Sequence, residues 1–133
     1  MEKLEHIGIA VKDINKANVL FGQLLGKTPY KTEVVDSEGV KTSFFEISGI
    51  KIELLEATHQ DSPIARFIEK KGEGIHHLAF EVANIESSIE EYKSKGFDLI
   101  NAEPKPGADN KMIAFLHPKS TQGVLIELCQ EKE

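Results

Sequence analysis

Two histidines and two glutamates occur in this sequence as a repeated pair. Glu53 follows His6 in the first half of the chain, and Glu127 follows His77 in the second. Two imidazoles and two carboxylates form a mixed nitrogen and oxygen donor set, which suits Co²⁺, Ni²⁺, Mn²⁺, Zn²⁺ or Fe²⁺ better than a thiolate site does. The single cysteine, Cys129, excludes a zinc site built from several thiolates. The four residues therefore predict one divalent metal ion, with two octahedral positions left for a chelating substrate.

An internal repeat supports this interpretation. The segment HIGIAV at 6–11 aligns with HLAFEV at 77–82, at an offset of 71 residues. Later, GIKIEL at 49–54 aligns with GVLIEL at 123–128, at an offset of 74 residues. A lone histidine on a strand is more often a packed or surface residue than a ligand. Two matches in the same order place the histidine and glutamate at matching positions of two similar units, which favours a shared role.

Each half of the chain is predicted to form a strand, a helix and three further strands. The helices begin after the N-cap residues Asp13 and Asn84, and Gly26 and Gly96 end them. The first helix carries an apolar stripe formed by Ile14, Ala17, Phe21, Leu24 and Leu25. The strands are predicted at residues 4–11, 30–35, 40–47, 50–56, 75–82, 97–100, 111–116 and 124–130, with 104–110 as a loop. Ser62 and Pro63 open a short connecting helix that ends near Gly72.

Strand alternation predicts which way the four candidate ligands point. Apolar side chains occupy every second position of the strands that carry them, and these sets suit packing beneath the helices. His6, Glu53, His77 and Glu127 all fall on the opposite face, with small neighbours such as Gly8 and Ala79. His76 points the other way by the same rule, and His59 and His117 lie near loops.

Length and charge limit the classes of function. A chain of 133 residues fits one domain, 1–133, with repeat one at about 1–56, the connecting helix at about 62–72 and repeat two at about 75–133. The formal net charge of −6 argues against nucleic acid as a partner. The chain contains no apolar run long enough for a membrane span and no signal-peptide pattern, so we expect a cytoplasmic protein without a membrane partner.

The chain resembles the vicinal-oxygen-chelate (VOC) superfamily, which includes glyoxalase I, ring-cleaving dioxygenases and antibiotic-resistance proteins. Within it the chain is most similar to the methylmalonyl-CoA epimerases. Three stretches carry this resemblance: HIGIAV at 6–11, DSPIARF at 61–67 with GIHHLAF at 74–80, and FLHPKS at 115–120 with GVLIEL at 123–128. The resemblance implies an α+β fold in which two βαβββ repeats form a curled sheet of the glyoxalase/bleomycin-resistance/dioxygenase type around a metal cleft.

The resemblance also implies a reaction, the epimerisation of methylmalonyl-CoA at C2 through an enediolate. The divalent ion would stabilise the enediolate, and two carboxylates would move the proton. Glu127 is the expected catalytic base, with Glu53 as the second. Some epimerases place a glutamate at the position of Thr42, and threonine is a poor base. The expected partner is an acyl-CoA thioester, whose phosphates could meet Lys105, Lys111 or Lys119, although a solvated surface is the more common place for a lysine. Related proteins are often homodimers, so a homodimer is among the expected states.

Two other functions use the same fold. Glyoxalase I would isomerise the glutathione hemithioacetal of methylglyoxal with the same four ligands, but Ala10 stands where many glyoxalases have an arginine. A non-catalytic antibiotic-binding protein would need no metal, so four intact ligands count against it. An extradiol dioxygenase needs three ligands, and a fourth at Glu53 argues against that activity.

Overall fold

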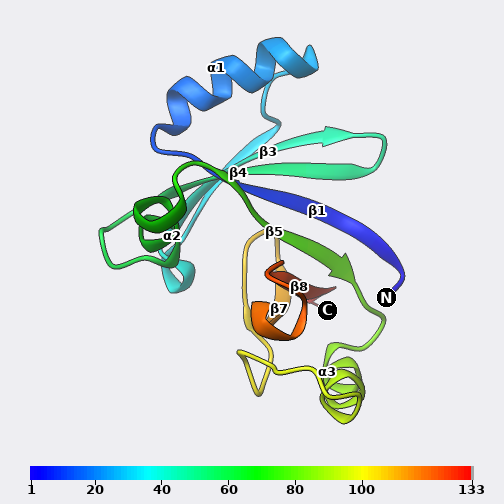
Figure 1. Ribbon diagram of the computed structural model, residues 1–133. Coiled ribbons are helices and arrows are strands. Elements are labelled where there is room, and N and C mark those ends of the chain that lie inside the picture. Colours follow the sequence, from blue (N-terminus) through cyan, green and yellow to red (C-terminus); the bar gives the residue numbers. More distant parts are fainter. Residues whose placement is uncertain (133) are drawn as a thin grey trace. The chain divides into compact units, whose positions relative to one another are not determined.

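The computed structural model describes residues 1–132, and these residues form two compact units. One unit consists of Ile7–His76, and the other combines Met1–His6 with the chain from His77 onwards. The unit boundaries fall inside two strands, β1 (Lys3–Ala10) and β5 (Gly74–Glu81). The N-terminal half of β1 therefore belongs with the second half of the sequence. Figure 1 shows the elements along the chain in the colours of the sequence.

The Ile7–His76 unit is built on three antiparallel strands. The order β2-β3-β4 joins β2 (Lys31–Val35), β3 (Val40–Ile47) and β4 (Ile50–Ala57), and the last two form the long hairpin seen in Figure 1. The 3₁₀ turn Asp36–Glu38 links β2 to β3, and α2 (Pro63–Lys71) packs on β4. The core of this unit consists of Val11, Ile14, Phe45 and Leu54, with Ile9, Ala17, Phe21, Leu25 and Ile52 packed against it.

The first helix, α1 (Ile14–Leu25), has the predicted ends and most of the predicted stripe. The Asp13 carboxylate accepts hydrogen bonds from the backbone N–H groups of Asn15 and Lys16, at 3.0 and 3.2 Å. Gly26 ends the helix in the left-handed conformation, with φ 68°. The prediction for Leu24 was wrong, because its side chain is 70% exposed. The next residue, Leu25, packs against the core and completes the stripe.

The second unit contains β5 beside β8 (Ile126–Glu131) in parallel, and β7 (Lys111–Leu116) antiparallel to β8. The helix α3 (Ile85–Ser94) packs on β7 and β8, and the Asn84 side chain caps it by accepting from the Ser87 N–H at 3.0 Å. The core beneath α3 consists of Val82, Ile85, Ile89, Ala114 and Leu128. Ala79, Ile113 and Cys129 form a separate cluster, with Phe115 packed against it.

The strand predicted at 97–100 was wrong. That segment makes a single bridge, Leu99 to Leu116. The ladder stops there because the Asn101 side chain, rather than the backbone, accepts the Phe115 N–H at 2.9 Å. The edge strand of this unit is instead β6 (Lys105–Pro106), which pairs with β7 inside the segment predicted as a loop. The 3₁₀ turn Pro118–Ser120 precedes β8, which begins later than predicted.

The order of elements confirms the α+β fold with two βαβββ repeats. The first repeat runs β1-α1-β2-β3-β4 and the second runs β5-α3-β6-β7-β8, with α2 between them. Among the helices of residues 1–132, none is both long and apolar enough to cross a membrane.

Candidate metal centre

Three of the four predicted ligands lie together in the unit that contains both chain ends. His6 is the last residue of the β1 segment that belongs to this unit, and His77 is the first residue of its β5 segment. Glu127 on β8 is registered opposite Ala79, two residues beyond His77 on the same face of β5. Three strands therefore each contribute one side chain, and all three residues are 5% exposed.

The donor atoms of these residues converge on one point. His6 Nε2 lies 3.0 Å from His77 Nε2, and the Glu127 carboxylate oxygens lie 3.3 Å from His77 Nε2 and 3.6 Å from His6 Nε2. Ligands held about 2.1 Å from one ion, at angles near 90–115°, are separated by about 3.0–3.6 Å. The two imidazole rings meet edge to face at 86°, and the 3.0 Å between their Nε2 atoms shows that each ring directs this nitrogen toward the other. This donor set fits a small divalent cation.

The charge of Glu127 suits the same role. Burial raises the pKa of the Glu127 carboxyl, but the charge of His6, its hydrogen bond to this carboxylate and the charge of His77 together outweigh burial. Glu5 opposes this lowering slightly, and the net pKa of Glu127 lies below its ordinary value. Glu127 is therefore a buried, ionised carboxylate that can bind a cation or accept a proton.

Two residues that the sequence analysis did not assign to the site lie behind His6. The carboxylate Oε1 of Glu5 is 2.6 Å from His6 Nδ1, the ring nitrogen that faces away from the donor cluster. Lys111 Nζ lies 3.9 Å from Glu5 Oε2 and 3.4 Å from Glu131 Oε1. Lys111 is only 4% exposed, so treating it as a solvated surface lysine was wrong.

Glu53, the fourth predicted ligand, belongs to the Ile7–His76 unit. It lies on β4, 3% exposed and opposite Phe44 of β3. Thr42 faces the same side of that hairpin, two residues before Phe44, and its buried hydroxyl has no hydrogen-bond partner within residues 1–132. The role of Glu53 as ligand and second base stays a prediction.

The remaining candidates have other surroundings. His76 packs edge to face on Phe67, with ring centroids 4.9 Å apart, and burial together with the charge of Lys71 lowers its pKa to about 4. His117 accepts the Lys119 N–H at the 3₁₀ turn before β8. Cys129 is buried, and burial followed by the charges of Glu127 and Glu5 raises the pKa of its thiol. Cys129 is therefore a neutral packing residue.

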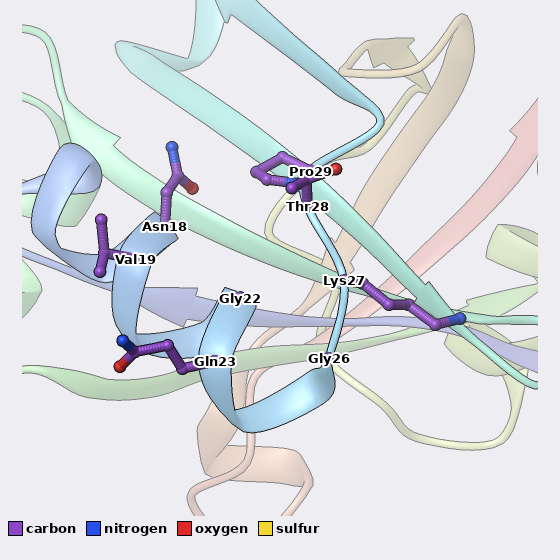
Figure 2. Close-up of a pocket in the computed structure, with 8 residues that line it drawn as sticks. All are labelled: Asn18, Val19, Gly22, Gln23, Gly26, Lys27, Thr28 and Pro29. Atoms are coloured by element: carbon purple, nitrogen blue, oxygen red, sulfur yellow. The ribbon is translucent and has the colours of Figure 1, made fainter.

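A surface groove occurs in the Ile7–His76 unit, but its lining carries no acid–base chemistry. Figure 2 shows it along the C-terminal half of α1 and the segment that follows the helix. Its only charged lining residue is Lys27, whose Nζ donates to the Glu46 carbonyl at 2.6 Å. The described residues that line the groove include no histidine or carboxylate, so it is not a candidate metal or proton-transfer site.

Comparison with known proteins agrees with the predicted resemblance. A model of the glyoxalase/bleomycin resistance protein/dioxygenase superfamily matches residues 5–115. Human mitochondrial methylmalonyl-CoA epimerase is 39% identical over 129 residues, covering 96% of this chain and 73% of that protein. Solved structures also match.

A hypothetical protein from Bacillus halodurans has a TM-score of 0.95 and 50% identity, covering 98% of this chain and 95% of that chain. A variant of Streptomyces coelicolor methylmalonyl-CoA epimerase, in complex with 2-nitronate-propionyl-CoA, has a TM-score of 0.92 and 32% identity over the same shares of the two chains. This chain therefore belongs to the glyoxalase/bleomycin resistance protein/dioxygenase superfamily.

Proposed function

We propose that this protein is a metal-dependent methylmalonyl-CoA epimerase that interconverts the two C2 epimers of its acyl-CoA substrate. The observation that carries the proposal is the convergence of His6, His77 and Glu127 in a chain whose relatives have this activity by name. The S. coelicolor relative binds a CoA thioester with a nitronate at carbon 2. A nitronate carbon is planar, as the corresponding carbon of an enediolate is, which supports the same intermediate here.

The proton at C2 is acidified by the thioester carbonyl, and epimerisation removes it from one face and returns one to the other. His6, His77 and Glu127 would hold the cation, with Glu53 as the proposed fourth ligand. When bound, the divalent ion supplies Lewis-acid stabilisation of the negative charge that develops on the thioester and carboxylate oxygens. On an octahedral ion, four protein ligands would leave two positions for those oxygens.

The proton itself needs a carboxylate base. Glu127 is ionised and buried, and a carboxylate has two oxygens, so one can bind the ion while the other accepts the proton. Glu53 is the proposed base for the opposite face, because Thr42 cannot act as one near neutral pH. Phe115 packs edge-on against the His77 ring, with centroids 5.9 Å apart, and so restrains the orientation of that ligand.

Proton exchange tests the proposal directly. Protein stripped of metal and reloaded with Co²⁺ is incubated with methylmalonyl-CoA in D₂O, and deuterium at C2 is followed by mass spectrometry. We expect exchange to be fast with loaded protein and to stop on chelation. The hemithioacetal of methylglyoxal and glutathione is assayed with the same preparation. Faster turnover of that adduct, without C2 exchange, would replace the epimerase proposal with a glyoxalase.

Other expectations belong to this proposal and rest on analogy. A homodimer and a cytoplasmic location stay predictions. Mixed nitrogen and oxygen sites accept Co²⁺, Mn²⁺, Ni²⁺ and Zn²⁺, so the stripped protein is reloaded with each in turn and the exchange rates are compared.

A further inference from the structure

We infer that Glu5 is a positioning residue that orients His6 for metal binding, and that the buried Lys111 balances its charge. This inference rests on the metal-dependent function proposed above. It concerns only residues of the unit formed by Met1–His6 and the chain from His77 onwards. Three observations carry it: a short carboxylate–imidazole contact, the burial of every group in it, and a buried ammonium behind the carboxylate.

The contact determines which nitrogen of His6 can bind a cation. The 2.6 Å separation between Glu5 Oε1 and His6 Nδ1 is that of a charge-assisted hydrogen bond, in which Nδ1–H donates to the carboxylate. A histidine that binds a metal is neutral, and in that form of His6 the lone pair would be on Nε2, the atom that faces His77 Nε2 and Glu127. A ligand histidine held by a carboxylate in this way binds more strongly, because its tautomer and ring orientation are set in advance.

The burial of Glu5 requires a counter-charge. Glu5 is 4% exposed, and Glu127 places a second carboxylate on the other side of His6. Lys111 supplies one positive charge at 3.9 Å from Glu5 Oε2. Its second partner, Glu131, has a side chain that is 77% exposed, so solvent screens much of that interaction. Taken by themselves, Glu5, Glu127 and Lys111 carry one net negative charge around His6.

This arrangement predicts that substitutions of Glu5 and of Lys111 change the Co²⁺ affinity in opposite directions. Glu5→Gln replaces the charged acceptor of the His6 Nδ1–H by a neutral amide and removes one negative charge, so Co²⁺ should bind about 10–100-fold more weakly. Lys111→Met removes a positive charge near the ion, so the protein without metal should be less stable while Co²⁺ binds more tightly. A buried ion pair with a purely structural role would lower the stability in both variants and leave the Co²⁺ affinity unchanged.

The test is a Co²⁺ titration of the full-length, metal-free protein, followed by the visible absorption of the bound ion and by thermal unfolding with and without metal. Glu131→Gln is the matched control, because it removes a carboxylate partner of the same lysine without touching His6. It should leave affinity and spectrum unchanged. Glu5→Asp retains the charge on a shorter side chain and should recover part of the affinity lost in Glu5→Gln.

The outcomes separate this inference from the proposed function. Weaker Co²⁺ binding and an altered spectrum in Glu5→Gln, with native circular dichroism, would support the positioning role. Equal affinities and identical spectra for wild type and Glu5→Gln would overturn it while leaving the metal centre intact. A wild-type protein that binds no Co²⁺ would overturn both. If Lys111→Met does not fold, the double variant Glu5→Gln/Lys111→Met is compared with Glu5→Gln and should bind Co²⁺ more tightly than that single variant.

Discussion

Replacing Glu127 by glutamine keeps the shape of the side chain and removes one buried negative charge. The carboxylate oxygens of Glu127 lie 3.3 Å from His77 Nε2 and 3.6 Å from His6 Nε2. At an effective dielectric constant near 20, a unit positive charge at either distance is attracted by about 5 kcal/mol. The desolvation of a buried carboxylate offsets several kcal/mol of this attraction. We therefore expect Glu127→Gln to weaken metal binding at least about tenfold, or ~1.4 kcal/mol.

In Glu127→Gln, the turnover number should fall by a larger factor than the metal affinity does. An amide oxygen can still face a cation, but it cannot accept a proton at neutral pH. Removing a general base typically costs about 10²–10⁴ in rate. We expect kcat for C2 epimerisation to fall by that factor even at metal concentrations that saturate the variant, with KM changing much less.

The assay is deuterium incorporation at C2 of methylmalonyl-CoA, measured across a Co²⁺ titration so that affinity and turnover are separated. Glu90→Gln on the exposed side of α3 is the matched control, because it makes the same chemical change at a residue that is not a proposed ligand. It should exchange at the wild-type rate. Glu127→Gln protein with full metal occupancy and a rate within twofold of wild type would refute the assignment of Glu127 as a base.

Three further predictions concern the two units separately. Leu54→Ala empties part of the α1 core and should lower the free energy of unfolding by about 2–5 kcal/mol in urea titrations; a smaller loss would mean that the core collapses into the space. Thr42→Val replaces a buried hydroxyl that lacks a hydrogen-bond partner within residues 1–132, and should stabilise the protein by up to about 1 kcal/mol, whereas a loss of stability would reveal a partner for that hydroxyl. Cys129 is fully buried, with the pKa of its thiol raised mainly by burial, so a thiol reagent should label it slowly in native protein and completely in urea; fast native labelling would contradict the packing.

The repeat and the strand alternation made much of this arrangement predictable. Leu128 packs with Val82 beneath α3, while Ala79 and Cys129 cluster on the other face, as the alternation predicted. His77 and Glu127 come together because β5 and β8 are parallel neighbours in a register that places Glu127 opposite Ala79. Side chains alternate between the two faces of a strand, so knowing which face is buried is enough to predict where each side chain points. The orientation of the candidate ligands could therefore be predicted without knowing the loops.

Glu5 and Lys111 could not be predicted in the same way. Adjacent residues of a strand point to opposite faces, so alternation separates Glu5 from His6 even though the longer side chain reaches its neighbour's ring. Lys111 is 106 positions away in sequence and looked like a strand-end surface lysine. The one available signal was a glutamate between Leu4 and the predicted ligand His6 within a strand, since a buried carboxylate requires a partner. The edge strand β6 was missed because two residues leave no period to detect.

The placement of the donors has a consequence for folding as well as for catalysis. His6 comes from a six-residue segment at one end of the chain, and His77 and Glu127 come from strands of the second repeat. A cation shared by the three would join Met1–His6 to the rest of its unit, although His6 and His77 are 71 positions apart in the sequence. Metal binding would therefore stabilise the native state by an amount set by concentration and affinity, and the strongest effect would fall on the docking of Met1–His6. Glu5 lies within that same segment, so the residue that orients the ligand is ordered by the same docking. The contact of His6 with the metal then depends on Met1–His6, and this segment is held in place by the Glu5–Lys111 ion pair and by the metal itself.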